Sequence, residues 1–579
     1  MNLNMIYNTS VEQPVNDVLK QHHKLLKWLL ILFLIIAHVT ISLAQTNVDN
    51  TFQATSEFVP VIKESAKFAD LPEIKDTVKR ISNVKYGIVS NPLFPKYQVQ
   101  KIDAAKMQNE PLTKLYHSLL KVGYGPLYNM PYGEFFISNL RSRDVVFGAH
   151  LKHLSSSKTL ENTGYSGFSD NYGTVYGKKF YKKHTLNGDI TYNRNVVHYY
   201  GYDPAINTIN DNDYIKQRYQ LVEPKLVLQS HFTDSSKINH TINAGFYNLQ
   251  NLHKEAENNV NVGVDASMFL NHEKLNLGFS TNYYNHKQSN DTLNDLIISL
   301  APSFEAQGKK WKALVGLKGT LDNFKGKTRF YGYPQLNVEY DIYESIIIPY
   351  AGATGGLMKN SLRSLSNENP FIDTTLNYVN TNNKYNLYLG LKGSLSSNTS
   401  YDVKGSYSQM DSMHFYVINY SGINQMYNQF DVIYDNASVI HLSGQIKHQM
   451  KEKIHFITKG NYYVYNTKNL TRAYHKPDFD LTFSTIYNLQ SKIILRAEVF
   501  AIGKQWMQTQ ILDDTNKPVL TPKQLNGLVD VNLEGEYRYS KMLSFFARVN
   551  NIANQRYYRW ERYPTQRFNF TIGLTFVPF

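Results

Sequence analysis

Three short stretches contain residue types that carry chemistry in other proteins, but none has the spacing that the chemistry needs. Residues 326–328 (Gly-Lys-Thr) resemble the end of a phosphate-binding loop, yet the glycine required earlier in that motif is replaced by Leu321. Residues 210–213 (Asn-Asp-Asn-Asp) offer oxygen ligands for calcium but lack the glycine and distal glutamate of a calcium-binding loop. His150 and His153 are three positions apart, which places them on opposite faces of a strand. We expect a turn, an acidic loop and no metal site.

Other signatures of catalysis are absent from the sequence. There is no cysteine, which rules out disulfides, thiolate metal sites and a cysteine nucleophile. There is also no Gly-x-Ser-x-Gly elbow and no His-Glu-x-x-His motif. We therefore expect no catalytic residue, no cofactor and no enzymatic activity.

One aromatic stretch near the C-terminus has the composition of a binding surface. Between Asn554 and Tyr563, arginines alternate with aromatic residues, of which the candidates for ligand contact are Tyr557, Tyr558, Trp560 and Tyr563. Mixtures of arginine and aromatic rings suit contact with sugars, lipid headgroups or proteins. The alternative, which the sequence favours, is an aromatic girdle at the outer rim of a membrane protein.

The last strand of the chain follows this aromatic stretch. Apolar residues fall on every second position over Gln566–Phe579, at Phe568, Phe570, Ile572, Leu574 and Phe576, and the chain ends in Phe579. Small or polar residues lie between them, so the strand has one apolar and one polar face. This pattern predicts the closing strand of an outer-membrane β-barrel.

The same alternation recurs along the chain from residue 114. We expect 22 strands, which start near residues 114, 132, 145, 171, 184, 214, 237, 258, 274, 296, 311, 329, 345, 385, 400, 429, 453, 478, 492, 527, 543 and 566. In the strand near residue 527, Val529 and Leu533 alternate with Asp530 and Glu534. A face that carries such charges is not a dry core, so it must face solvent or a water-filled lumen.

The connections between these strands alternate between short and long. Lys182-Lys183 and residues 308–310 are short polar links, whereas residues 201–213 and 362–384 are long ones. A barrel with periplasmic turns and extracellular loops shows this alternation. The fold class that we expect is therefore all-β, an antiparallel transmembrane barrel of about 22 strands.

The N-terminus has the features of a secretory signal. An apolar run over residues 28–37 follows Lys20, Lys24 and Lys27, and small residues follow it. We expect cleavage after Ala44, which leaves Gln45 as the first mature residue. The expected organisation is a signal peptide at 1–44, an irregular, proline-rich periplasmic segment at 45–113 and a barrel at 114–579.

The composition also indicates which kinds of partner the protein binds. The formal net charge is +14, and the mean hydropathy is −0.42 despite 44 tyrosines and 30 phenylalanines. Because an exported chain rarely meets nucleic acid, we expect anionic partners such as outer-membrane lipid, lipopolysaccharide or an acidic protein.

Two parts of the sequence resemble a known family. Asn550-Asn551-Ile552, Tyr557-Tyr558, Tyr563-Pro564, Arg567-Phe568, Gly573 and Phe579 resemble the last two strands of TonB-dependent outer-membrane receptors. The stretch from Glu110 to Ser157 looks like the first hairpins of members that lack a plug. The resemblance implies an outer-membrane barrel for transport or uptake, but only the 69 residues of 45–113 are available for a plug, and no clear TonB box is present.

The lumen of so wide a barrel needs an occupant. Residues 45–113, folded-in extracellular loops and a partner protein are the three possibilities. Two further functions remain open beside transport, namely a non-transporting subunit of an outer-membrane complex and an open diffusion pore.

Overall fold

The computed structural model describes residues 116–578, apart from 140–141, 210, 272, 289–290, 374, 421–425, 452, 514 and 516. The predicted signal peptide with its cleavage site at Ala44 and Gln45, the segment 45–113 and Phe579 lie outside the described residues.

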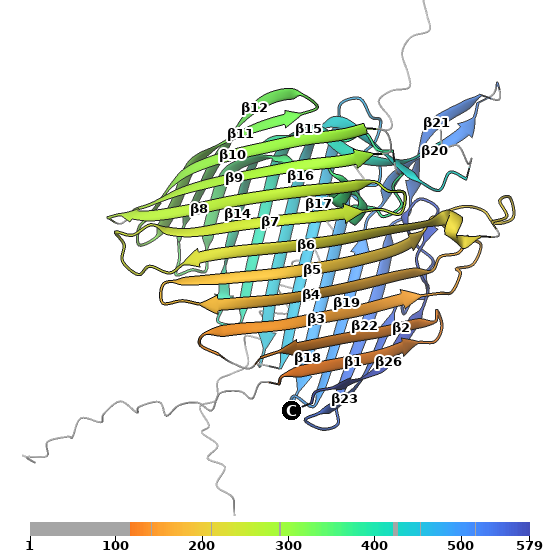
Figure 1. Cartoon of the computed structure of the whole chain (residues 1–579), viewed down its shortest axis with the longest axis horizontal. Helices are drawn as coiled ribbons and strands as arrows, with labels where there is room; N and C mark the ends of the chain where they lie inside the picture. The colour runs from red at the N-terminus through yellow and green to blue at the C-terminus, as the bar shows by residue number, and fades with distance from the viewer. Residues whose placement is uncertain are drawn as a thin grey trace, which may run out of the picture. The chain divides into compact units, whose positions relative to one another are not determined.

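The described chain forms one closed antiparallel barrel of 22 strands (Figure 1). Consecutive strands pair with one another, and the last strand pairs with the first. The wall strands are β1 (Ser118–Gly125), β2 (Met130–Ser138), β3 (Val145–Ser156), β4 (Phe168–Phe180), β5 (His184–His198), β6 (Lys216–Ser230), β7 (Asn239–Gln250), β8 (Ala256–Leu270), β9 (Glu273–Gln288), β10 (Asp291–Gln307), β11 (Trp311–Phe324), β12 (Lys327–Tyr340), β13 (Ile348–Met358), β14 (Thr381–Ser396), β15 (Thr399–Ile418), β16 (Phe430–Met450), β17 (Ile454–Thr467), β18 (Phe479–Leu489), β19 (Ile493–Ile502), β22 (Leu528–Arg538), β23 (Leu543–Asn550) and β26 (Asn569–Phe576). The predicted fold class and strand number are confirmed.

The remaining elements lie in the long loops. They are η1 (Asn212–Ile215), α2 (Leu362–Glu368), the hairpin β20 (Gln505–Leu512) with β21 (Pro518–Leu525), and the short pair β24 (Tyr558–Trp560) with β25 (Tyr563–Pro564). Within the described ranges, no helix is long and apolar enough to cross a membrane.

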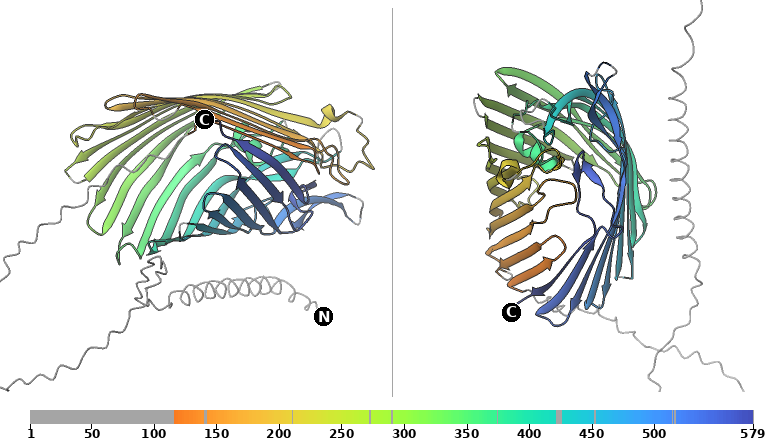
Figure 2. Two further views of the ribbon diagram at one scale, coloured as in Figure 1. Left: turned by 90° about the horizontal axis from the view of Figure 1, so that it is seen from below. Right: turned by 90° about the vertical axis from the view of Figure 1, so that its right-hand side faces the viewer.

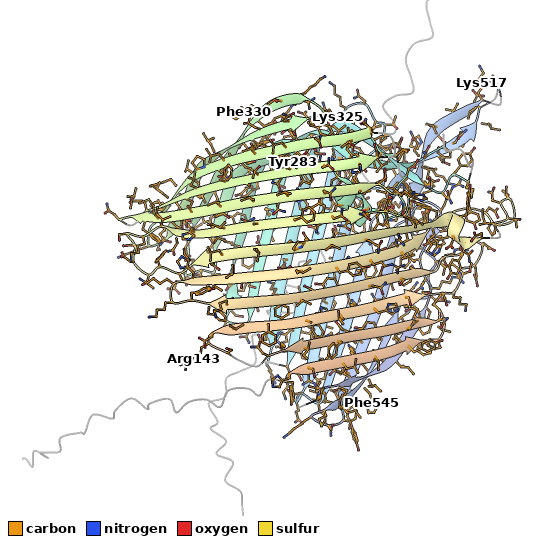
Figure 3. The ribbon with its side chains drawn as sticks, in the orientation of Figure 1. Arg143, Tyr283, Lys325, Phe330, Lys517 and Phe545 are labelled. Atoms are coloured by element: carbon orange, nitrogen blue, oxygen red, sulfur yellow. The ribbon has the colours of Figure 1, made fainter. Side chains whose placement is uncertain are left out.

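The two faces of the wall differ as the alternation predicts. In β22, Val529 and Leu533 are exposed on the outer face, while Asp530 is buried and Glu534 is partly buried on the lumen side. Large apolar side chains project outward all around the wall, including Tyr283, Phe330 and Phe545 (Figure 3). An apolar outer face around a polar interior is the wall pattern of an outer-membrane barrel.

The barrel closes between β26 and β1. Phe576 lies opposite Leu120, Leu574 opposite Val122, and Ile572 opposite Tyr124. Phe568, Ile572, Leu574 and Phe576 are exposed on the outer face, and Phe570 is partly buried. On the lumen side β26 carries Asn569, Thr571, Gly573 and Thr575, so the closing strand has apolar side chains toward lipid and small or polar ones inside.

The ten connections at one end of the barrel are short turns, and those at the other end include all the long loops. Because outer-membrane barrels have short periplasmic turns, the short-turn end faces the periplasm and the long-loop end faces outward.

Candidate functional site

The long loops do not all project away from the barrel, since several fold into its mouth. Side chains from four loops and the adjoining strands pack into one buried cluster, which we call the loop cap. Its buried members are Tyr199, Tyr202, Ile215, Tyr219, Tyr247, Leu249, Leu362, Leu365, Phe371, Ile372, Leu376, Tyr378, Tyr416, Ile418, Met426, Phe430, Val432, Trp560 and Tyr563. The lumen is therefore occupied at the long-loop end by the barrel's own loops, which was one of the three possibilities raised by the sequence.

The loop between β13 and β14, residues 359–380, is the central part of the loop cap. In the right-hand view of Figure 2, its helix α2 lies inside the ring of strands. We call residues 359–380 the cross-lumen segment, because its contacts reach two opposite parts of the wall.

The first anchor of the cross-lumen segment is on β6 and β8. The Arg363 guanidinium donates two hydrogen bonds of 2.8 Å to the two carboxylate oxygens of Glu223 on β6. The backbone N–H of Leu362 donates to Glu257 on β8 at 2.7 Å. Glu223 has only 8% of its side chain exposed, so the bidentate pair is shielded from water and strengthened by that shielding.

A second set of contacts on the same side holds both ends of the segment. Lys359 lies 2.6 Å from the carboxylate of Asp295 on β10, and the Asn380 amide donates to that same carboxylate at 2.9 Å. Asn380 also donates to Asp322 on β11 at 3.1 Å. The segment thus leaves and re-enters the wall through polar contacts with adjacent strands.

The second anchor is on the other side of the barrel. Glu368 at the end of α2 accepts from His414 on β15 at 2.7 Å, from Lys476 after β17 at 2.7 Å and from Tyr416 at 3.1 Å. In the closed ring of 22 strands, ten strands lie between β6 and β17 in either direction. The cross-lumen segment therefore spans the lumen and is fixed at opposite points of the wall.

The Glu368 anchor predicts acid sensitivity. Burial acts to raise the pKa of Glu368, but the hydrogen bond from His414 and the charge of Lys476 outweigh it and lower the pKa to about 2. A carboxyl with a lowered folded-state pKa stabilises the fold above its ordinary value of 4.5 and stops doing so as pH falls toward 2. We expect the conductance of the barrel in planar bilayers to stay low down to about pH 4.5 and to rise between there and pH 2.

Two variants test this acid response. Glu368→Gln should raise the conductance at neutral pH and remove most of the acid-dependent rise. Glu161→Gln, at an exposed loop position, should leave the response unchanged. An unaltered acid response in Glu368→Gln would show that this anchor does not control the lumen.

Two other carboxyl groups at the long-loop end have a raised pKa. Burial raises the pKa of Glu255, in the loop before β8, to about 7, and it raises the pKa of Glu561, between β24 and β25, to about 7 as well. Asn251 donates to Glu255 at 2.6 Å. The long-loop end therefore carries less negative charge at neutral pH than its composition indicates.

The aromatic residues proposed for ligand contact lie at the edge of the loop cap and inside it. Tyr563 stacks on Phe371 with ring centres 3.8 Å apart, and Trp560 packs edge-on against Tyr416. The exposed fractions of Trp560 and Tyr563 are only 7% and 2%. Neither residue belongs to a lipid-facing girdle, so that interpretation is wrong for these two. Both side chains are buried in the loop cap instead.

The other two aromatic candidates are less deeply placed. Tyr557 is partly buried and donates to Asp530 on β22 at 2.6 Å. Tyr558 is partly buried, with Arg556 lying over its ring at 5.8 Å. These four residues are therefore not gathered on one exposed binding surface.

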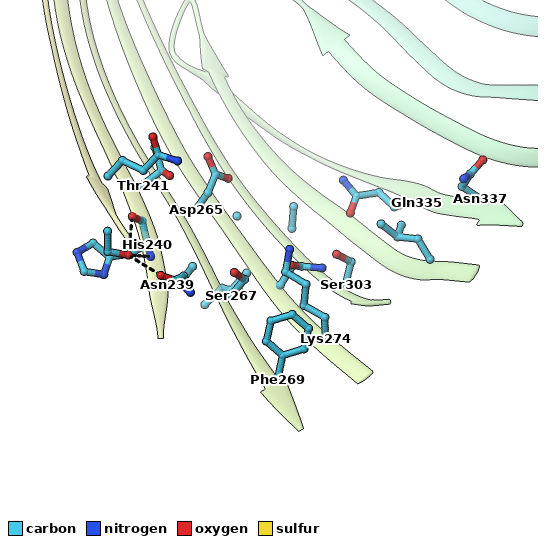
Figure 4. A pocket seen from close by; sticks show the side chains of 18 of the residues that line it. Asn239, His240, Thr241, Asp265, Ser267, Phe269, Lys274, Ser303, Gln335 and Asn337 are labelled. Atoms are coloured by element: carbon cyan, nitrogen blue, oxygen red, sulfur yellow. Dashed lines mark hydrogen bonds between the residues drawn. The ribbon is translucent and has the colours of Figure 1, made fainter. Parts of the chain in front are cut away.

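Two hollows remain in the lumen, and Phe371 of the cross-lumen segment lines one of them. The first, of about 490 Å³, lies at the long-loop end and is lined by amides and carboxylate of β22, β23 and β26 together with Tyr200, Phe371 and Tyr557. The second, of about 800 Å³, lies on the inner wall at the short-turn end, and its lining includes Asp265, Lys274 and Asn337 (Figure 4). Both hollows are lined by polar and apolar side chains, and their volumes are in the range of small-molecule sites.

The weaker sequence candidates have ordinary structural roles. Residues 325–326 form the tight turn between β11 and β12, with Gly326 in the left-handed region at φ 72°. Asp211 caps η1, and Asp213 pairs with Lys216 at 2.9 Å. His150 bonds Glu134 inside the barrel, while His153 bonds Asn171 on the other face of the strand. Over the described positions, no group of three or more His, Asp or Glu side chains is arranged to hold a metal ion.

Arg363 and Glu368, which anchor the cross-lumen segment, were not among the sequence candidates. One local signal could have marked them, because Ser361 and Ser364 form a capping box that starts α2 and so predicts an ordered loop. Their partners lie 140 and 108 positions away along the chain, and no local pattern indicates such pairs.

Comparison with known proteins adds to this picture at the level of the fold. No protein-family model matches the chain, and no curated protein matches it. Among solved structures, the FrpB iron transporter of Neisseria meningitidis is similar with a TM-score of 0.62 and 10% identity, over 80% of this chain and 82% of that chain.

Two further solved structures are similar to the same extent. The siderophore receptor PirA of Acinetobacter baumannii has a TM-score of 0.61 and 10% identity, over 81% of each chain. A mutant of the ferric enterobactin receptor PfeA of Pseudomonas aeruginosa has a TM-score of 0.57 and 14% identity, over 79% of each chain. The protein therefore has the 22-stranded barrel fold of the TonB-dependent outer-membrane receptors.

Proposed function

We propose that this protein is an outer-membrane uptake barrel whose lumen is closed by the loop cap and opened by movement of the cross-lumen segment. The observation that carries the proposal is the fixation of residues 359–380 at opposite points of the wall, through Arg363 and Glu368. A ligand that competes for these polar anchors would favour a state in which the segment has left its closed position. The role is one of transport rather than catalysis.

A small hydrophilic solute fits the lumen best. The hollow of about 490 Å³ at the long-loop end and the hollow of about 800 Å³ at the short-turn end both present amide and carboxylate groups that can bind a polar solute. The names of the structural neighbours describe an iron transporter and siderophore receptors. We propose iron chelates as the first class of cargo to test, with residues 45–113 as a reduced plug or periplasmic coupling segment.

Growth on chelated iron tests the proposal. A strain without its own siderophore receptors should grow on a ferric siderophore when it expresses this chain, and growth should stop when the inner-membrane energising complex is deleted. Growth without the energising complex would contradict energy coupling. No growth on a panel of ferric siderophores would contradict the cargo class.

One observation favours the alternative of a non-transporting subunit. The β20–β21 hairpin extends away from the wall (Figure 1), and Ile511, Leu512, Val519 and Leu520 on it are 40–64% exposed. Exposed apolar side chains on a projecting hairpin suit a protein contact. Recovery of a stoichiometric partner after mild detergent extraction, and its loss in Leu512→Ser/Leu520→Ser, would support this role over uptake.

A further inference from the structure

Two neighbouring short turns place a group of lysines at the periplasmic end of the wall. The turn between β4 and β5 contributes Lys183, and the strand end before it contributes Lys179; the turn between β6 and β7 contributes Lys237. All three side chains are exposed. The turns are adjacent, because the N–H of His231 donates to the Lys183 carbonyl at 2.8 Å.

Each of these lysines lies beside an aromatic ring. The ammonium groups of Lys183 and Lys237 lie 5.9 and 5.7 Å from the centre of the same Phe232 ring. The ammonium group of Lys179 lies 6.0 Å from the ring centre of Tyr181, which is 53% exposed. The two ammonium groups therefore border the same aromatic ring.

Two histidine rings complete this group on its outer side. His184 packs against Phe232 and His240, with ring centres 5.4 Å apart in both pairs. His184 lies an even number of positions before Ile190, which is 58% exposed, so the two side chains share the outer face of β5. On β7, His240 shares a face with Ile238 and Ile242 in the same way, and both isoleucines are exposed. The alternation of side chains along these strands therefore places the two histidine rings on the lipid-facing side of the wall, although Phe232 and His240 also border the hollow of about 800 Å³. We call Lys179, Tyr181, Lys183, His184, Phe232, Lys237 and His240 the headgroup cluster.

Asp234 lies in the same turn as Lys237 and is the acidic group that acts on the charges of both Lys183 and Lys237. The carboxylate of Asp234 accepts from the Ser236 backbone N–H at 3.0 Å and from the Ser236 hydroxyl at 2.7 Å. Asp144, in the turn between β2 and β3, is the other acidic residue of the adjoining turns. The three lysines of the headgroup cluster outnumber these two carboxylates, so a local excess of positive charge remains.

The position of the cluster selects its ligand. It lies on the outer surface at the short-turn end, at the level where the headgroups of the inner leaflet meet the apolar belt of the barrel. Lipopolysaccharide is confined to the other leaflet, beside the long loops. We propose that the headgroup cluster is a binding site for an anionic phospholipid of the inner leaflet, whose phosphate contacts Lys183 and Lys237 while its glycerol region packs on Phe232 and Tyr181.

Lipid retention by the full-length barrel tests this site. The chain, purified in a neutral detergent, is equilibrated with equal amounts of dioleoylphosphatidylglycerol and dioleoylphosphatidylcholine, and bound lipid is counted by native mass spectrometry. We expect phosphatidylglycerol to be retained in preference, and the triple variant Lys179→Gln/Lys183→Gln/Lys237→Gln to reduce that preference by about tenfold or more, given the contribution of each lysine near a charged headgroup.

Matched variants separate a site from a general effect of charge. Lys309→Gln/Lys310→Gln/Lys453→Gln removes the same charge from other short turns and should leave the preference unchanged, and lysine-to-arginine replacement of the cluster should retain it. The heat-modifiable band of a folded barrel verifies that each variant is closed. Equal loss in both triple glutamine variants, an unchanged preference in the cluster variant, or displacement of the lipid by inorganic phosphate or lipopolysaccharide would each overturn the proposal.

Discussion

Replacing residues 361–379 with a short Gly-Ser linker is expected to turn a closed barrel into a conducting pore. The replacement removes both anchors and the central apolar residues of the loop cap, among them Leu362, Leu365 and Ile372, while the wall strands β13 and β14 stay joined. Because a 22-stranded wall encloses a lumen wider than that of a porin, single-channel conductance should rise by roughly tenfold or more.

The design includes the N-terminal segment as a competing occupant. Four chains are compared in planar bilayers, namely the full chain, the linker variant, a chain without residues 45–113 and the combination of both changes. A large increase in the linker variant alone identifies the cross-lumen segment as the closure. If only removal of residues 45–113 opens the barrel, the assignment is wrong and that segment is the plug.

A single substitution should also raise the conductance, but by less than the linker replacement does. Arg363→Ala removes the bidentate partner of Glu223 and leaves Lys225, whose ammonium group lies 3.0 Å away, as the remaining charge partner of that carboxylate. The released segment should then fluctuate, and brief openings should appear in otherwise closed recordings. Arg567→Ala, whose partner Glu161 is 76% exposed, serves as the control and should not open the barrel.

The wall was predictable because each strand contacts two different media. Lipid outside and water inside impose a period of two on the sequence, and each of the 22 expected starting points lies within about five residues of an observed strand start. The closing strand shows this well, since Ile572 and Leu574 face outward and Thr571 and Gly573 face the lumen.

The loop cap could not be predicted in the same way. Its contacts join residues far apart in the chain, and no periodic environment acts on the loops that form it. Trp560 and Tyr563 illustrate the difficulty, because aromatic residues near arginines suit a lipid interface, a ligand surface and a packed cap equally well by composition. Only the pairing of Tyr563 with Phe371 across the mouth distinguishes these cases.

The seam between the first and last strands depends on small residues. Gly123 of β1 lies directly opposite Gly573 of β26, and the Phe546 ring from β23 covers both on the lumen side. Lys121 lies over the same ring at 4.3 Å, and Lys121 also pairs with Glu534 on β22 at 3.6 Å. The side chains that bridge the seam can approach it because the two glycines leave room.

Gly573→Val is therefore expected to prevent closure of most barrels. A Cβ at this position would lie 2.1 Å from the carbonyl oxygen of Val122 and 2.4 Å from the Phe546 ring. The carbonyl belongs to the partner strand, so relief requires the two strands to separate at the seam, and overpacking typically costs about 1–3 kcal/mol even where only side chains move. The heat-modifiable, folded band of outer-membrane preparations should fall by more than half.

Gly133→Val is the matched control for this prediction. Gly133 lies on β2, next to the first strand, and a Cβ there meets no atom within 4 Å. Valine also suits a strand better than glycine does, so this variant should fold as well as the parent. Normal assembly of Gly573→Val would show that the seam tolerates a wider strand separation, whereas failure of both variants would place the defect in strand propensity or export rather than in closure.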